Sequence, residues 1–274
     1  MTNELRAAWA VARKELLIAR RYPLQLVTEV LQPLYQFLLP SLLLGATFYV
    51  GGRAIGLEAS AGTDDLAGFL FIGIIVAGVV AAAFWDMAFG LKREMDSGTL
   101  EPMWLTPTRP DTTVLGRAIS GMIVNSVASI ILIAAGVIFF GAALGGALLP
   151  AVPVLLLATI SMVGVGYMVA AGVLMIREPN FMVDATNFVF STLSGVAFPI
   201  VVLPLFLQPI AYALPTTYAV DLIRHYALET RPLLDPGLEW AVLVAFAVGT
   251  VAVGRWLFLR TEHRMRVRGT TGQH

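Results

Sequence analysis

Long apolar stretches alternate with short polar or proline-rich gaps along this chain of 274 residues. A helix that crosses the roughly 30 Å hydrocarbon core of a bilayer needs about 20 apolar residues. Six stretches reach that length and predict membrane-spanning helices at about 24–50, 66–90, 113–140, 150–176, 183–206 and 238–259. Most of the intervening gaps contain Gly, Pro or charged residues, which are typical of breaks between helices. The pattern predicts an all-α polytopic membrane protein with six transmembrane helices in one domain, residues 1–274.

The segment before the first apolar stretch, residues 4–21, predicts a helix that lies on the membrane surface. Its apolar stripe, at spacings typical of one helix face, consists of Leu5, Trp9, Ala12, Leu16 and Ala19. Basic residues lie beside and behind this stripe, as in interfacial amphipathic helices. Two interpretations stay open: the helix is only a topology anchor, or it is an elbow that also contacts a cytoplasmic partner.

The gap after the second span predicts a helix–break–helix unit. Lys92 and Arg93 suit the C-terminal end of a helix, and Gly98 supplies a left-handed stop. Thr99 is expected to cap a short second helix. The apolar face of that helix consists of Leu100, Met103 and Trp104. An interfacial turn anchored by the tryptophan is the alternative. Asp111 or Thr112 is then expected to cap the third span.

The apolar segment between the fifth and sixth spans contains four prolines, at positions 199, 204, 209 and 215. Proline interrupts a helix, so we expect residues 199–228 to form broken, re-entrant helices. Non-helical backbone at membrane depth must be buried in protein or line a cavity. Thr216 and Thr217 are expected to cap a final short helix that carries Asp221 and Arg224.

Two predicted spans carry a polar face. The face on the first span consists of Gln25, Glu29, Gln32 and Gln36, and the face on the fifth of Asp184, Asn187, Ser191 and Ser194. Polar side chains that point at lipid cost free energy, so the first face should lie at a helix or dimer interface or along a substrate path. Small hydroxyl residues also allow helices to approach closely, which is the simpler explanation of the second face.

Composition and charge support a membrane location. Hydrophobic residues make up 58% of the chain and charged residues 13%, with a formal net charge of zero, which gives no indication of nucleic-acid binding. Fifteen basic residues fall on one side of the predicted topology, and only Arg53, Arg224 and Arg231 on the other. The positive-inside rule then places both termini in the cytoplasm of a multi-pass protein of the cell (inner or plasma) membrane.

Several kinds of chemistry are missing from the sequence. Cysteine is absent, and neither lysine, Lys14 or Lys92, follows a glycine, so the chain has no phosphate-binding Gly-Lys-Ser/Thr loop. The three histidines form no pair with metal-ligand spacing. We therefore expect no catalytic residue, no metal site and no cofactor in this chain.

Three motifs together resemble type-2 ABC exporter permeases. The first is REMDSGTLE at 93–101 followed by LTP at 105–107. The second combines FP at 198–199, LP at 203–204 and LPTTYAVD at 214–221 with Arg224. The third is ARKEL at 12–16. The three motifs occur in the order and at the spacing of that family, and the resemblance covers the whole chain.

This resemblance implies a half-transporter subunit that pairs with a second permease, identical or homologous, and with two copies of a separate ABC ATPase subunit that binds the ATP and Mg. The residues expected to couple to the ATPase are Glu94, Gly98, Thr99, Leu100, Glu101 and Trp104. The expected pathway or dimer face consists of Gln25, Glu29, Gln32, Gln36, Asn187 and Ser191. The expected function is ATP-driven export of a lipophilic drug, antibiotic or lipid. Export of a lipid-linked glycan, a secondary transporter or channel, and a regulatory membrane partner are the alternatives.

Overall fold

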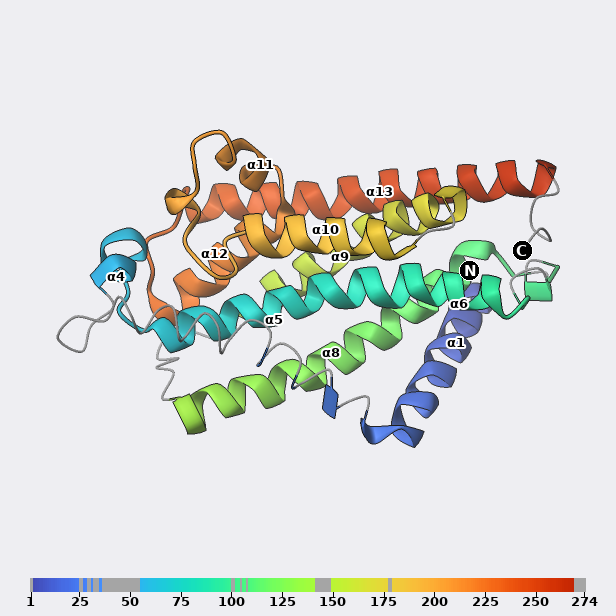
Figure 1. Ribbon diagram of the computed structural model, residues 1–274, viewed down its shortest axis with the longest axis horizontal. Coiled ribbons are helices and arrows are strands. Elements are labelled where there is room, and N and C mark those ends of the chain that lie inside the picture. Colours follow the sequence, from blue (N-terminus) through green and yellow to red (C-terminus); the bar gives the residue numbers. More distant parts are fainter. Residues whose placement is uncertain are drawn as a thin grey trace.

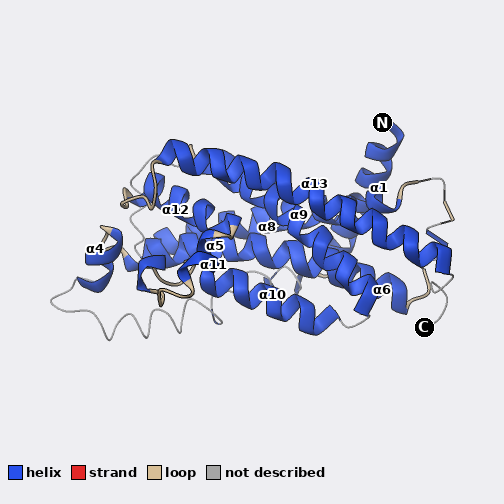
Figure 2. Cartoon of the chain, turned by 90° about the horizontal axis from the view of Figure 1, so that it is seen from above, coloured by secondary structure: helices blue, strands red, loops and turns tan. Residues whose placement is uncertain are grey.

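The computed structural model describes residues 2–24, 27, 28, 31, 35, 55–99, 102, 103, 105, 106, 108–140, 149–176 and 179–268. The regular elements named within these ranges are all helices, which confirms the predicted all-α class (Figure 2). They are α1 (Thr2–Arg21), α4 (Ile55–Ala61), α5 (Leu66–Phe84), the π-helix η2 (Trp85–Phe89), α6 (Gly90–Asp96), α8 (Pro110–Phe140), α9 (Ala151–Ile176), α10 (Pro179–Leu193), the 3-10 helix η3 (Ile200–Val202), α11 (Gln208–Tyr212), α12 (Pro215–Leu228) and α13 (Pro236–Arg268).

The long helices lie side by side along one axis of an elongated bundle (Figure 1). The start of α1, α6 and the C-terminal end of α13 lie at one end of the bundle, and α4, α11 and α12 lie at the opposite end (Figure 1). The sequence predicts that the first end is cytoplasmic and the second external. Helix α1 runs obliquely to the long helices, as an interfacial helix does (Figure 1).

Four helical segments are long and apolar enough to cross a membrane: Leu66–Asp96, Asp111–Phe139, Ala151–Ile176 and Pro236–Val267. They agree with the second, third, fourth and sixth predicted spans. The second extends beyond its predicted end at residue 90, because α5, η2 and α6 follow one another without a break. The first predicted span, 24–50, lies mostly outside the described residues.

The predicted fifth span, 183–206, is wrong as a continuous helix. Helix α10 ends at Leu193 after 15 residues, which at about 1.5 Å per residue is shorter than the roughly 30 Å hydrocarbon core. The chain leaves the helix at Gly195, whose φ of 78° is left-handed, before it reaches the first proline. Residues 194–196 are buried in the protein, which is the condition for non-helical backbone at membrane depth.

The centre of the bundle is formed by α5 and α9. In their most apolar windows 72% and 61% of the residues are buried, against 22% in both α8 and α13, whose apolar outer faces are suited to lipid. Close helix approach depends on small residues: a Cβ on Gly254 of α13 would lie 2.1 Å from the carbonyl oxygen of Gly164 of α9. Thr250 adds an interhelical hydrogen bond from its Oγ1 to the carbonyl oxygen of Ser161, 3.0 Å away.

Helix α1 has the predicted extent, but its apolar stripe does not act as one face. Leu5 and Trp9 are exposed, whereas Ala12 is fully buried together with Ala8. Helix α1 contacts α8 at Gly116, where an added Cβ would lie 2.6 Å from the carbonyl oxygen of Ala8. The helix therefore uses its small residues against protein and leaves its large apolar side chains outside, where lipid is available.

Candidate functional site

The predicted break after the second span has the geometry of a helix stop. Gly98 has a φ of 66°, and its amide donates to the carbonyl oxygen of Met95 over 3.1 Å. The amide of Thr99 donates to the carbonyl oxygen of Glu94 over 3.0 Å. These two bonds form a Schellman motif, which ends α6 in a sharp turn. The predicted glycine stop is confirmed.

The carboxylate of Glu94 lies at the centre of a charge cluster formed by three parts of the chain. Its Oε1 is paired with the guanidinium of Arg117 from α8 and with Nζ of Lys14 from α1, which is 3.4 Å away. Its Oε2 accepts a hydrogen bond from the hydroxyl of Thr99 in the turn. Glu15 of α1 lies 3.8 Å from Arg117 Nη2 and 3.3 Å from Lys14 Nζ. Glu94 thus connects the turn at Gly98 to both α1 and α8.

The side chain of Arg117 is almost completely buried between α8 and α6, with 5% of its surface exposed. An added Cβ on Gly90 of α6 would lie 1.9 Å from Arg117 Nη1, so only glycine leaves room for the guanidinium there. Partial burial weakens solvent screening, so these ion pairs are stronger than exposed ones.

Three predicted caps have other roles in the structure. The hydroxyl of Thr99 contacts Ser97 and Glu94 behind it. Thr112 donates to Oε2 of Glu4 in α1, and this hydrogen bond lowers the pKa of Glu4. Asp111 pairs with Arg255 of α13 over 2.6 Å. Asp111 and Thr112 are therefore used in contacts between distant parts of the chain, at the end of the bundle that the sequence predicts to be cytoplasmic. The predicted capping of residues 100–101 by Thr99 lies outside the described residues.

The remaining predicted coupling residues, Leu100, Glu101 and Trp104, lie outside the described residues, so their assignment stays a prediction. The amide of Met103 donates to the carbonyl oxygen of Thr99 over 3.2 Å, which fits the start of the expected second helix.

Only some of the predicted pathway or dimer residues lie within the described part of the chain. Gln25, Glu29, Gln32 and Gln36 lie outside the described residues. Asn187 and Ser191 lie on α10, where the Ser191 hydroxyl donates to Asn187 Oδ1 over 3.3 Å. Ser191 is buried and Asn187 half-buried, while Asp184, at the start of the same face, is exposed. This face therefore becomes more buried toward the C-terminal end of α10.

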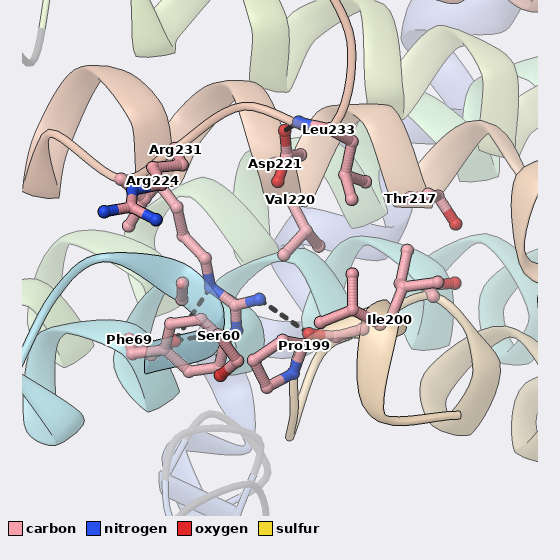
Figure 3. A pocket seen from close by; sticks show the side chains of 15 residues that line it. Ser60, Phe69, Pro199, Ile200, Thr217, Val220, Asp221, Arg224, Arg231 and Leu233 are labelled. Atoms are coloured by element: carbon pink, nitrogen blue, oxygen red, sulfur yellow. Dashed lines mark hydrogen bonds between the residues drawn. The ribbon is translucent and has the colours of Figure 1, made fainter. Parts of the chain in front are cut away.

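At the end of the bundle formed by α4, α11 and α12, the side chain of Arg224 in α12 is buried, and no carboxylate among the described residues forms an ion pair with it. Its guanidinium donates to the carbonyl oxygens of Gly195 (2.6 Å), Val196 (2.7 Å) and Phe69 (2.8 Å) (Figure 3). Its Cζ also lies 3.3 Å from the centroid of the Phe69 ring. Burial lowers the pKa of Arg224 to about 9, so the group remains cationic at neutral pH.

Two of the backbone carbonyls bound by Arg224, those of Gly195 and Val196, lie at the break after α10, and the third is that of Phe69 in α5. Gly73 of α5 allows this segment to approach, because an added Cβ would lie 2.0 Å from the carbonyl oxygen of Val196. Arg224 therefore links three parts of the structure: α12, α5 and the non-helical segment that follows α10.

Arg224 lines a small polar pocket together with Asp221, Thr217 and Arg231 (Figure 3). Burial raises the pKa of Asp221, whose Oδ2 accepts a hydrogen bond from the amide of Leu233 over 2.8 Å. The prediction that Thr216 and Thr217 cap this helix is wrong: α12 begins at Pro215 after Leu214, and both threonines lie inside its first turn, where Thr216 contacts Ser194 and Thr217 donates to the carbonyl oxygen of Ala211. The predicted short helix that carries Asp221 and Arg224 is confirmed, and it is a packed part of the bundle.

Sequence reasoning missed the roles of Lys14, Arg117, Gly73 and Gly90. The available signal was that Gly73 stands in an otherwise apolar helix, where a glycine is often a site of close backbone approach, and that Gly90 stands at the end of the second apolar stretch. The partners of Lys14 and Arg117 are distant in sequence, so no local pattern indicates them.

Comparison with known proteins supports the resemblance. The family model described as ABC-2 type transporter matches residues 6–228, most of the chain, including most of α1, the turn at Gly98 and α12. The search of curated proteins gave no match. The matched range contains both the Glu94 cluster and Arg224, and the structure is an apolar helical bundle with membrane-spanning helices. The chain belongs to the ABC-2 type transporter family and is a membrane-embedded permease component of an ABC transporter.

Proposed function

We propose that this chain is the permease subunit of an ATP-driven exporter of lipophilic compounds, with ATP hydrolysed on two copies of a separate ABC ATPase subunit and with a second permease completing the pathway. The observation that carries the proposal is the Glu94 cluster, because it connects the turn expected to dock on the ATPase to two other helices.

The structure offers a direct mechanical route from the turn into the membrane. Helix α6 continues through η2 into α5, the most buried spanning segment. A displacement of the turn at Gly98 therefore moves a helix that contacts the centre of the bundle. Through Glu94, the same displacement acts on α8 at Arg117 and on α1 at Lys14. ATP binding would favour one of two arrangements of these elements.

The π-helix η2 lies between α5 and α6 and would allow the angle between these two helices to change. Trp85 and Phe89 stack across this turn with ring centroids 4.4 Å apart. π-helical turns inside α-helices are wider and less regular, and they frequently occur at functional sites. We therefore assign η2 the role of a hinge between the coupling turn and the external half of α5.

The lipophilic substrate class is supported by the surface of the described helices. The outer faces of α8 and α13 are apolar, and no polar domain separates the described helices from the bilayer. A substrate that already partitions into lipid can enter such a permease laterally from the bilayer. A lipid-linked glycan, by contrast, needs a polar path wide enough for sugars.

The test is uncoupling of hydrolysis from transport in the reconstituted complex. The permease is purified with its ATPase subunit, placed in proteoliposomes, and assayed for ATP hydrolysis and for uptake of lipophilic compounds. Glu94→Gln leaves Arg117 buried with its strongest partner neutralised. We expect the complex to assemble, while substrate-stimulated hydrolysis and transport fall about tenfold or more. Trp104→Ala is expected to weaken ATPase binding, since central aromatic residues often dominate an interface.

Asp96→Asn is the matched control. Asp96 lies in the same helix as Glu94, but its exposed side chain pairs with Lys92 one turn earlier. We expect this variant to behave as the unmodified protein. If Glu94→Gln and Trp104→Ala both retain ATPase binding, stimulated hydrolysis and transport, the coupling assignment is wrong. Transport driven by an ion gradient without the ATPase would instead indicate a secondary transporter.

A further inference from the structure

A second pocket lies at the predicted cytoplasmic end, between the C-terminal half of α1, the second span and α8. Its lining includes two carboxylates, Glu15 and Asp86, and two guanidiniums, Arg93 and Arg117. Ile18 of α1 and Val124 of α8 provide an apolar side. The pocket is distinct from the turn at Gly98, which does not line it.

The pocket lies at the depth of the lipid headgroups. Asp86 follows Leu66 by 20 residues, so at about 1.5 Å per residue it is about 30 Å along the second span, the thickness of the hydrocarbon core. Ile18 at the pocket is partly exposed, as is Leu17 beside it. A lipid molecule can therefore place its headgroup between α1 and α8 while its acyl chains remain in the bilayer.

The groups in the pocket are arranged for a ligand that carries both charges. Arg117 is buried, and its Nε and Nη1 donate no hydrogen bond within the described part of the chain. An added Cβ on Gly121 would lie 2.1 Å from Asp86 Oδ2, so glycine makes room for this carboxylate beside α8. The two guanidiniums and the two carboxylates of the lining balance in charge, and so do Lys14 and Glu94, which pair with Glu15 and Arg117 beside it.

An anionic headgroup would give this charge-balanced site a net negative charge. A lone amine would lie beside the buried cation of Arg117. A headgroup that contains a phosphate and an ammonium group satisfies both pairs, with the phosphate toward the guanidiniums and the ammonium toward the carboxylates. A primary ammonium donates three hydrogen bonds, which a quaternary choline cannot do.

We propose that this pocket binds the headgroup of a phosphatidylethanolamine molecule of the cytoplasmic leaflet and so fixes α1 against α8. The binding does not depend on the ATPase, and its test uses the permease alone, so failure here leaves the proposed transport function untouched.

The full chain is purified in detergent, delipidated, and titrated with phosphatidylethanolamine, phosphatidylcholine or phosphatidylglycerol of identical acyl chains. Bound lipid is counted by native mass spectrometry, and thermal unfolding is followed in parallel. We expect one phosphatidylethanolamine to be retained and to raise the unfolding midpoint more than the other two lipids do.

Two variants separate the pocket from general lipid contact. Asp86→Asn removes the charge that faces the ammonium, and we expect the affinity for phosphatidylethanolamine to fall about tenfold, the effect of one charge-assisted hydrogen bond. Ala19→Phe adds bulk to the pocket lining without changing any charge, and it should abolish the retained lipid. Arg264→Gln, at an exposed position near the end of α13, is the control and should retain the lipid.

Equal retention of all three lipids, or retention by Asp86→Asn and Ala19→Phe at the level of the unmodified protein, would overturn the proposal. A preference for phosphatidylglycerol would also overturn it, since it would indicate attraction by basic residues alone.

Discussion

Replacement of Arg224 should open the external end of the bundle. Arg224→Met keeps a long apolar side chain but removes the donors to three carbonyl oxygens, of Phe69, Gly195 and Val196. Hydrogen bonds from a charged donor contribute about 1.5–3 kcal/mol each. The methionine variant no longer has to bury a cation, and this saved desolvation cost offsets several kcal/mol of the lost hydrogen-bond energy. The difference between these two contributions gives an expected net loss of about 3–5 kcal/mol.

Arg224→Lys gives a second measure of the same contact. Lysine retains the charge, but a single ammonium cannot reach carbonyls from α5 and from the end of α10 at once, as the planar guanidinium does. We expect this variant to fall between the methionine variant and the unmodified protein.

The assay uses the absence of cysteine from the chain. A single cysteine at Ala197, next to the carbonyl of Val196, is labelled with a membrane-impermeant maleimide. A loss of about 3 kcal/mol raises the population of the open external end about 100-fold, and the labelling rate should rise accordingly. Thermal unfolding of the purified protein gives an independent measure of the same loss.

Arg231→Met is the matched control, because Arg231 lines the same pocket but is exposed. It should leave the labelling rate unchanged. The reasoning is refuted if Arg224→Met labels and unfolds like the unmodified protein, or if Arg231→Met has the same effect as Arg224→Met.

Three further predictions concern topology, pH and the first span. A cysteine at Ser97 should be labelled only from the cytoplasm and one at Ala59 only from outside; the reverse pattern would overturn the orientation. The hydrogen bond that lowers the pKa of Glu4 should stabilise the docking of α1 above pH 4.5, and this stabilisation should be lost as the pH falls through the lowered pKa of the folded state. Hydrogen exchange should detect the acid-induced release of α1, and the release should be absent in Glu4→Gln. Leucine at Gln32 and Gln36 should weaken dimer formation or transport without impairing insertion, and unchanged crosslinking and transport would show that the polar face is idle.

Patterns local in the chain were read correctly from sequence. Apolar stretches of about 20 residues identified four spanning segments, since length and hydropathy alone decide whether a helix can cross a bilayer. The stop at Gly98 was also predictable, because a left-handed residue after a helix is a property of a few neighbouring residues. The broken segment before α12 followed from its prolines.

Predictions that assumed local partners were wrong. Asp111 and Thr112 have the chemistry of helix caps, but α8 already begins at Pro110, and their side chains bond to Arg255 and Glu4 instead. Helix α10 ends earlier than its apolar sequence indicates, because the carbonyls released at Gly195 and Val196 find a donor in Arg224. Without that donor, burial of these carbonyls would be too costly.

The sequence by itself determined the membrane class, four spanning helices, the extent of α1 and the turn after α6, since each depends on neighbouring residues. Only the tertiary structure decided which charges meet. Arg224 and the carbonyl of Phe69 are separated by 155 positions, and Lys14 and Glu94 by 80. Such pairs depend on how helices pack, and packing is fixed by shape at positions such as Gly73 and Gly90, where a single added methyl group would collide with a neighbour.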